Sequence, residues 1–196
     1  MRIFITVLVL IFSIQSLTKA DDIRDFQIEG MSVGDSLKNY MDIDLIKEAL
    51  NNEFAFYYKK DFVTISTWEI RDKYKIYDDV GVVLNRNDKK YKIYALEGIL
   101  YFQDKDIDKC HKKQIEITDS IKNSLDLSTE GNTFFIPKDR LKKHQKSKKY
   151  IDFELSEGGV IRTSCLEVKK GVAKNVDYHL LHVIVNSSLF WKYINK

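Results

Sequence analysis

Two cysteines, Cys110 and Cys165, are the side chains with the best-defined chemistry in this chain. An even number of cysteines in an exported chain, which this one is expected to be, favours a disulfide. A redox pair would normally form a Cys-x-x-Cys motif, and a zinc site would need two further ligands from only four histidines. The sequence therefore predicts a structural bridge, with a contribution of about 4 kcal/mol in the chain-entropy description.

A basic segment in the second half of the chain could bind an anionic surface. It holds one acid, Asp139, among the basic residues Lys138, Arg140, Lys142, Lys143, Lys146, Lys148 and Lys149. Such a run suits lipid head groups, polyanionic polysaccharides or nucleic-acid phosphates, and Phe134 and Phe135 could form an aromatic platform beside it. The alternative is a solvated loop, which the abundance of lysine throughout the chain favours.

Three alternating acids, Asp104, Asp106 and Asp108, look like the opening of a calcium-binding loop. That loop needs glycine at its sixth position and a bidentate acid at its twelfth, where this chain has Lys109 and Ile115. We therefore expect these acids to cap the helix that follows and to face the positive end of its dipole.

The histidines and the known catalytic motifs do not define an active site. His179 and His182 are expected on a strand, where this spacing places them on opposite faces and prevents a shared metal. The sequence contains no Gly-x-Ser-x-Gly elbow, no His-Glu-x-x-His, no phosphate loop and no dinucleotide fingerprint. It predicts no cofactor and favours a non-enzymatic protein, with a catalytic triad of distant residues left open.

Residues 1–20 have the pattern of a secretory signal peptide. A short positive start is followed by an apolar run of about 15 residues, with small residues at Thr18 and Ala20. The run is shorter than the ~20 residues that span a bilayer, so cleavage is favoured over a retained membrane anchor. The mature chain, 21–196, is expected in the periplasm or outside the cell.

The composition suits one folded domain. The chain has 196 residues, of which 44% are hydrophobic and one is proline, which excludes disordered and collagen-like proteins. A formal charge of +3 does not single out a polyanionic partner for the molecule as a whole. We expect a single α+β domain over 21–196, with a loose subdivision near 126–149 as the alternative.

Apolar periodicity predicts an α+β fold with an antiparallel sheet, because hairpins follow one another without strand–helix–strand repeats. The predicted strands are 54–58, 62–67, 74–77, 80–84, 91–102, 151–155, 160–168 and 177–186. Short helices are expected at 34–40 and 44–50, a main amphipathic helix at 108–125, and a terminal helix after Ser187 or Ser188. The main helix should pack across the sheet, with the disulfide joining its first turn to the strand of Cys165. Strand 91–102 is expected to be central and bulged at Gly98.

Two short stretches are familiar, GMSVGDSL at 30–37 and CHKKQ at 110–114. Together with the leader they resemble small exported proteins of AT-rich marine bacteria, a family without an assigned activity. The start of the first stretch, before two short helices and a meander, also resembles the small outer-membrane assembly lipoproteins and the β-lactamase-inhibitor-like folds. The chain lacks the lipidated cysteine of those lipoproteins, and neither resemblance implies functional residues.

The sequence thus predicts an exported, non-enzymatic binding or scaffold module of the periplasm or cell envelope. The sequence identifies neither ligand nor partner; the candidates are another envelope protein and an anionic surface, and nothing specifically indicates nucleic acid. Two alternatives stay open. One is a polyanion or membrane-surface binder through 138–149, and the other is a small-substrate hydrolase whose Ser, His and acid residues meet only in the folded chain.

Overall fold

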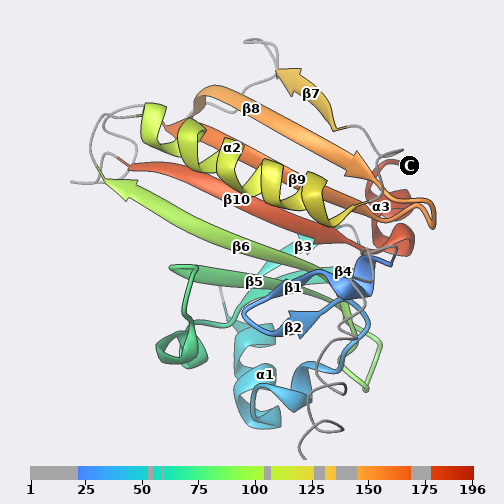
Figure 1. Ribbon diagram of the computed structural model, residues 1–196. Coiled ribbons are helices and arrows are strands. Elements are labelled where there is room, and N and C mark those ends of the chain that lie inside the picture. Colours follow the sequence, from blue (N-terminus) through green and yellow to red (C-terminus); the bar gives the residue numbers. More distant parts are fainter. Residues whose placement is uncertain are drawn as a thin grey trace, which may run out of the picture.

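One antiparallel sheet organises the computed structural model, which describes residues 22–52, 55–58, 60–103, 107–125, 131–135, 145–168 and 178–196. Within these residues the sheet has eight strands in the order β3-β4-β5-β6-β10-β9-β8-β7 (Figure 1). Their bounds are β3 Phe56–Tyr58, β4 Phe62–Ser66, β5 Asp79–Asn85, β6 Ile93–Gln103, β7 Asn132–Phe135, β8 Gln145–Glu154, β9 Val160–Val168 and β10 Tyr178–Asn186. Two meanders, β3 to β6 and β7 to β10, therefore meet where β6 pairs with β10.

The helix α2 (Ile107–Ser124) covers one face of the second meander and carries the chain from β6 to the far edge strand β7 (Figure 1). Its buried side chains recur along one stripe, at Cys110, Gln114, Thr118 and Ile121. The two polar members form hydrogen bonds with β9. The Gln114 amide donates to the Thr163 carbonyl at 3.1 Å, and the hydroxyls of Thr118 and Thr163 are hydrogen-bonded at 3.2 Å.

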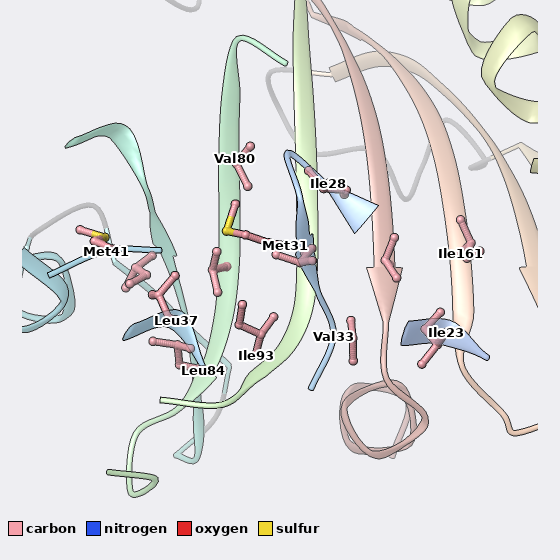
Figure 2. Close-up of a cluster of buried hydrophobic side chains, with 14 of the residues drawn as sticks. Ile23, Ile28, Met31, Val33, Leu37, Met41, Val80, Leu84, Ile93 and Ile161 are labelled. Atoms are coloured by element: carbon pink, nitrogen blue, oxygen red, sulfur yellow. The ribbon is translucent and has the colours of Figure 1, made fainter. Parts of the chain in front are cut away.

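The N-terminal segment covers the same face of the first meander. It comprises the 3-10 turn η1 (Ile23–Asp25), the hairpin β1 (Gln27–Ile28) and β2 (Met31–Ser32), the 3-10 turn η2 (Leu37–Asn39) and α1 (Ile43–Asn51). Figure 2 shows Met31 and Leu37 from this segment beside Leu84 of β5 and Ile93 of β6, all fully buried. We call this doubly covered side of the sheet the covered face.

The other side of the sheet, which we call the open face, is covered over a smaller area by the described part of the chain. The helix α3 (Ser188–Ile194) packs there over the ends of β4 to β6. Phe190 lies edge-to-face against Tyr58 and Phe62, with ring centroids 5.1 and 5.2 Å apart. As predicted, Ser187 caps this helix, accepting a hydrogen bond from the Phe190 backbone at 3.3 Å.

The predicted α+β class and the main helix are confirmed, but 74–77 is not a strand. This stretch follows the 3-10 helix η3 (Trp68–Lys73), and the backbone N–H groups of its last three residues are bound by a side chain instead of a neighbouring strand. The carboxylate of Glu29, in the β1–β2 turn, accepts from the backbone N–H groups of Lys75, Ile76 and Tyr77, each at 2.8 Å. Glu29 thereby ties the N-terminal segment to the loop before β5.

The expected bulge at Gly98 is also wrong. Gly98 pairs regularly with Val80 and Val183, and the register shift in β5–β6 lies near the other end, between Val83 and Leu84. Glycine is needed at Gly98 because the Tyr77 ring lies over it. A Cβ there would be 2.6 Å from two ring carbons.

Two further elements differ from the sequence prediction. No strand is predicted within 126–149, yet β7 and the beginning of β8 lie there as paired strands. The first short helix is reduced to the 3-10 turn η2, because Ser36 forms a β-bridge with Lys92. Within the described ranges, no helix combines the length and apolar character needed to cross a bilayer.

Glu29→Gln is expected to lower the free energy of unfolding by about 1–2 kcal/mol at neutral pH, because a charged acceptor forms stronger hydrogen bonds. Burial opposes ionisation, but the three N–H donors and the charge of Lys75 outweigh it and hold the pKa of Glu29 below 4.5. The stabilisation is therefore present above that value and is lost as pH falls through the lower folded pKa.

Urea unfolding at neutral pH and at about pH 3 measures this effect. The stability difference between wild type and E29Q should shrink on acidification. Glu48→Gln, at an exposed position of α1, serves as the control. Equal losses of unfolding free energy in E29Q and in Glu48→Gln would contradict the assignment of this stabilisation to the Glu29 carboxylate.

Candidate functional site

Cross-strand pairing arranges the open face in rows, because directly paired residues point to the same side of a sheet. One row runs from Glu97 on β6 through Ile184 on β10 to Arg162 on β9. The next row toward α3 contains Ala95 and Asn186. These rows bring together side chains from three strands that are distant in sequence.

A pocket of about 160 Å³ lies between these rows and α3. Four polar side chains line it, Thr64, Glu97, Arg162 and Asn186, together with aromatic and aliphatic side chains that include Tyr58, Phe190, Trp191 and Ile184. We call it the α3 pocket. Its volume is close to the ~150 Å³ of a cavity that admits benzene, so it suits one small organic group.

Glu97 supplies a negative charge to this pocket. Its Oε1 is hydrogen-bonded to His182 Nδ1, and both side chains are partly buried. Burial alone would raise the pKa of Glu97, but the hydrogen bond and charge of His182, with a contribution from Lys148, lower it. Glu97 is therefore ionised at neutral pH.

Arg162 lines the pocket as part of a neutralised pair. Its Nε and Nη2 each donate to an oxygen of Asp152 at 2.6 Å, in the bidentate geometry that guanidinium groups favour. The guanidinium carbon also lies 4.3 Å from the centroid of the Tyr150 ring and 5.1 Å from that of Trp191. The pair thus fixes the position of Trp191 at the pocket.

Thr64 is the least expected polar side chain at the site. It lines the pocket, and its hydroxyl is buried without a hydrogen-bond partner among the described residues. A buried hydroxyl without a partner costs about 1–3 kcal/mol, and such groups in native proteins commonly face a ligand or water.

A Ser–His–acid row also crosses the open face, as the hydrolase alternative requires. Ser164 is the direct cross-strand partner of His182, which binds Glu97. Ser164 is 0% exposed, however, and neither its hydroxyl nor His182 Nε2 has a hydrogen-bond partner among the described residues. Both strands are paired on each side, so their N–H groups are not free to bind an oxyanion. The geometry does not support hydrolysis at this row.

The predicted disulfide is present. Cys110 and Cys165 are bonded with their Cα atoms 6.0 Å apart, and the bridge joins the first turn of α2 to β9 as expected. Both cysteines are buried against Leu181 on the covered face. The bridge therefore supports the sheet from the side opposite the α3 pocket.

The basic segment is only partly described. Lys138, Arg140, Lys142 and Lys143 lie outside the described residues, as does the side chain of Lys146. Lys148 and Lys149 are consecutive on β8, so their side chains leave opposite faces of the sheet. Lys148 is on the open face, and its charge reaches Glu97. Anion binding by the whole segment stays a prediction.

The remaining candidates are separated in the fold. His179 and His182 point to opposite faces of β10, as predicted, and His179 is buried on the covered face. Asp104 and Asp106 lie outside the described residues, whereas Asp108 is in the first turn of α2. Among the described side chains, no group of three or more His, Cys, Asp or Glu could hold a metal ion.

Sequence reasoning missed Glu97, Arg162 and Asn186. Glu97 is the one charged residue of β6, and that signal could have identified it, whereas Arg162 and Asn186 share their strands with other polar residues. Their convergence could not be seen, because it depends on the pairing of β6 with β10.

A larger pocket of about 410 Å³ lies where α1, β4 and η3 meet, with Trp68 and Glu69 among its lining residues. Its polar residues are exposed or already paired, as in the 3.0 Å hydrogen bond from the Ser66 hydroxyl to Asp79. None of its described lining side chains is a buried polar group without a partner. The α3 pocket is therefore the better candidate.

Neither a family model, nor a curated protein, nor a solved structure matches this chain. The α3 pocket is characterised by its own side chains, which are a carboxylate, a guanidinium, an amide, a hydroxyl and aromatic rings from the sheet and α3.

Proposed function

We propose that this protein is an exported, non-enzymatic binding module whose ligand site is the α3 pocket on the open face of the sheet. The observation that carries the proposal is the buried hydroxyl of Thr64, which lines the pocket without a hydrogen-bond partner in the described chain. Folding leaves this group unsatisfied at a cost of about 1–3 kcal/mol, and a ligand with a complementary group would recover it.

The positions of the two sheet faces support the same proposal. The N-terminal segment and α2 cover one face of the sheet, whereas the open face carries only α3 in the described residues, beside the pocket. Strand-borne side chains are positioned more rigidly than loop side chains, which suits a preformed site. Export is part of the proposal and is supported by the leader sequence together with the disulfide.

A fragment screen on ¹⁵N-labelled full-length protein tests the proposal. Fragments that bind should shift the backbone signals of Ile184 and Asn186 and the indole signal of Trp191. Asn186→Leu, which fills the pocket with an apolar side chain, should abolish these shifts, whereas Ile115→Ala on the exposed side of α2 should leave them unchanged.

Two results would overturn the proposal. One is a set of bound fragments that all map away from the α3 pocket. The other is turnover of a hydrolase substrate panel by the purified protein that is lost in Ser164→Ala, because this would establish the row of Ser164, His182 and Glu97 as catalytic.

A further inference from the structure

Building on that proposed function, we infer that the α3 pocket takes a small uncharged organic molecule, of the size of one ring, that carries a hydroxyl group. Three features of the pocket support this ligand class. The charged side chains that line it already have partners, most of its other lining side chains are aromatic or aliphatic, and the Thr64 hydroxyl is buried without a partner in the described chain.

The charges at the pocket are already paired. Among the described lining residues, the charged ones are Glu97 and Arg162. Arg162 donates to both carboxylate oxygens of Asp152, at 2.6 Å each. Glu97 is bound to His182, and the charge of Lys148 also reaches it. A cation or an anion that entered would lose its hydration without meeting an unpaired opposite charge, and that loss is costly in a buried site. The pocket therefore discriminates against charged guests of either sign.

The volume and the apolar lining suit a single ring. The pocket holds about 160 Å³, close to the ~150 Å³ of a cavity that admits benzene. Tyr58 and Phe190 lie edge-to-face with ring centroids 5.1 Å apart, so two of its aromatic walls are fixed before a ligand arrives. Val83 and Ile184 add aliphatic walls. Burial of the apolar surface of the ring thus supplies the main part of the affinity.

The Thr64 hydroxyl supplies a directional contact. Thr64 lies on β4 and is paired with Val83 of β5, in the row that continues to Ala95 of β6. A hydroxyl can donate one hydrogen bond and accept two, so a guest hydroxyl can bind to Thr64 in either direction. An alcohol forms this bond at a much lower desolvation cost than an ammonium or a carboxylate group does.

The first test compares three probes built on the same ring: benzyl alcohol, benzylammonium and benzoate. Each is titrated into ¹⁵N-labelled full-length protein at neutral pH. We expect benzyl alcohol to shift the Trp191 indole signal and the Ile184 backbone signal with about tenfold higher affinity than either charged probe, because the alcohol alone enters without an unpaired charge.

The second test concerns the hydroxyl. Thr64→Val should weaken the binding of benzyl alcohol about fivefold, the effect of one hydrogen bond, and should not weaken the binding of toluene, which is the same ring without the hydroxyl. Thr118→Val is the matched control, because the Thr118 hydroxyl is bonded to Thr163 on the covered face, and it should change neither affinity. Without a guest, Thr64→Val should unfold at no lower urea concentration than wild type, since it removes a buried hydroxyl that has no partner.

Three results would count against the inference. Equal or tighter binding of benzylammonium or benzoate would overturn it while the α3 pocket stays a binding site. Equal weakening of benzyl alcohol and toluene by Thr64→Val would show that the hydroxyl does not contact the guest, and would overturn the alcohol assignment. A Trp191 signal that responds to none of the probes, and to no fragment in the screen, would overturn the proposed function as well.

Discussion

Loss of the Cys110–Cys165 disulfide is expected to lower the free energy of unfolding by about 4 kcal/mol. The bridge closes a loop with a sequence separation of 55, which restricts the unfolded chain far more than a short loop would. Both cysteines are fully buried between α2 and β9, so the folded state also depends on them for packing. The effect is a large fraction of the total stability of a typical domain.

Urea unfolding of the oxidised and the dithiothreitol-reduced protein measures this loss without removing any side-chain atoms. The Cys110→Ala/Cys165→Ala variant should be at least as unstable as the reduced protein, because it also loses packing volume. Wild-type protein with unchanged stability after complete reduction would show that the bridge contributes nothing to the fold.

Gly98→Ala is expected to cost about 3 kcal/mol, the upper end of the range for overpacking a core. The added methyl group would lie 2.6 Å from two carbons of the Tyr77 ring. The ring cannot move away easily, because Glu29 binds the backbone N–H of Tyr77 and of the residue before it. Burial, with the charge of Glu29, raises the pKa of Tyr77 to about 12, consistent with a ring held inside the fold.

Gly81→Ala is the matched control. Gly81 lies on the neighbouring strand β5, and a Cβ added there would have the Thr64 methyl carbon as its nearest neighbour, at 3.3 Å. We expect it to change the stability by less than about 1 kcal/mol. In a double-mutant cycle, Tyr77→Leu should cost less in the Gly98→Ala background than in the wild type. Additive effects would mean that the two side chains do not collide.

Local patterns in the sequence were enough to predict most of the sheet. Strands such as β9 and β10 were identified from runs of apolar residues, and α2 from its apolar stripe, since these periods reflect burial on one side of an element. The stretch 74–77 was misassigned because its tyrosines and isoleucine look like a strand. What distinguishes it is a distant carboxylate, Glu29, which binds its backbone.

The candidate site was harder to predict for the same reason. Glu97, Arg162 and Asn186 acquire their roles from cross-strand register, and no local pattern specifies which strand lies beside β6. The disulfide was predictable because an even cysteine count and the expected export constrain it independently of register. A feature that depends on one residue type, such as the disulfide, could thus be predicted from the sequence. A pocket formed by side chains from several strands could not.

The seam between the two meanders has a consequence for how the chain reaches this structure. Partners across β6–β10 are 75 positions apart at Gln103–Tyr178 and 91 apart at Ala95–Asn186, so this contact has the highest entropic cost of closure in the sheet. Before β10 pairs with β6 during folding, one backbone edge of β6 has no hydrogen-bonded neighbour. Two chains that exchanged their C-terminal halves would form the same ladder of hydrogen bonds, which makes this seam the natural place for an interlocked dimer to arise during folding at high protein concentration.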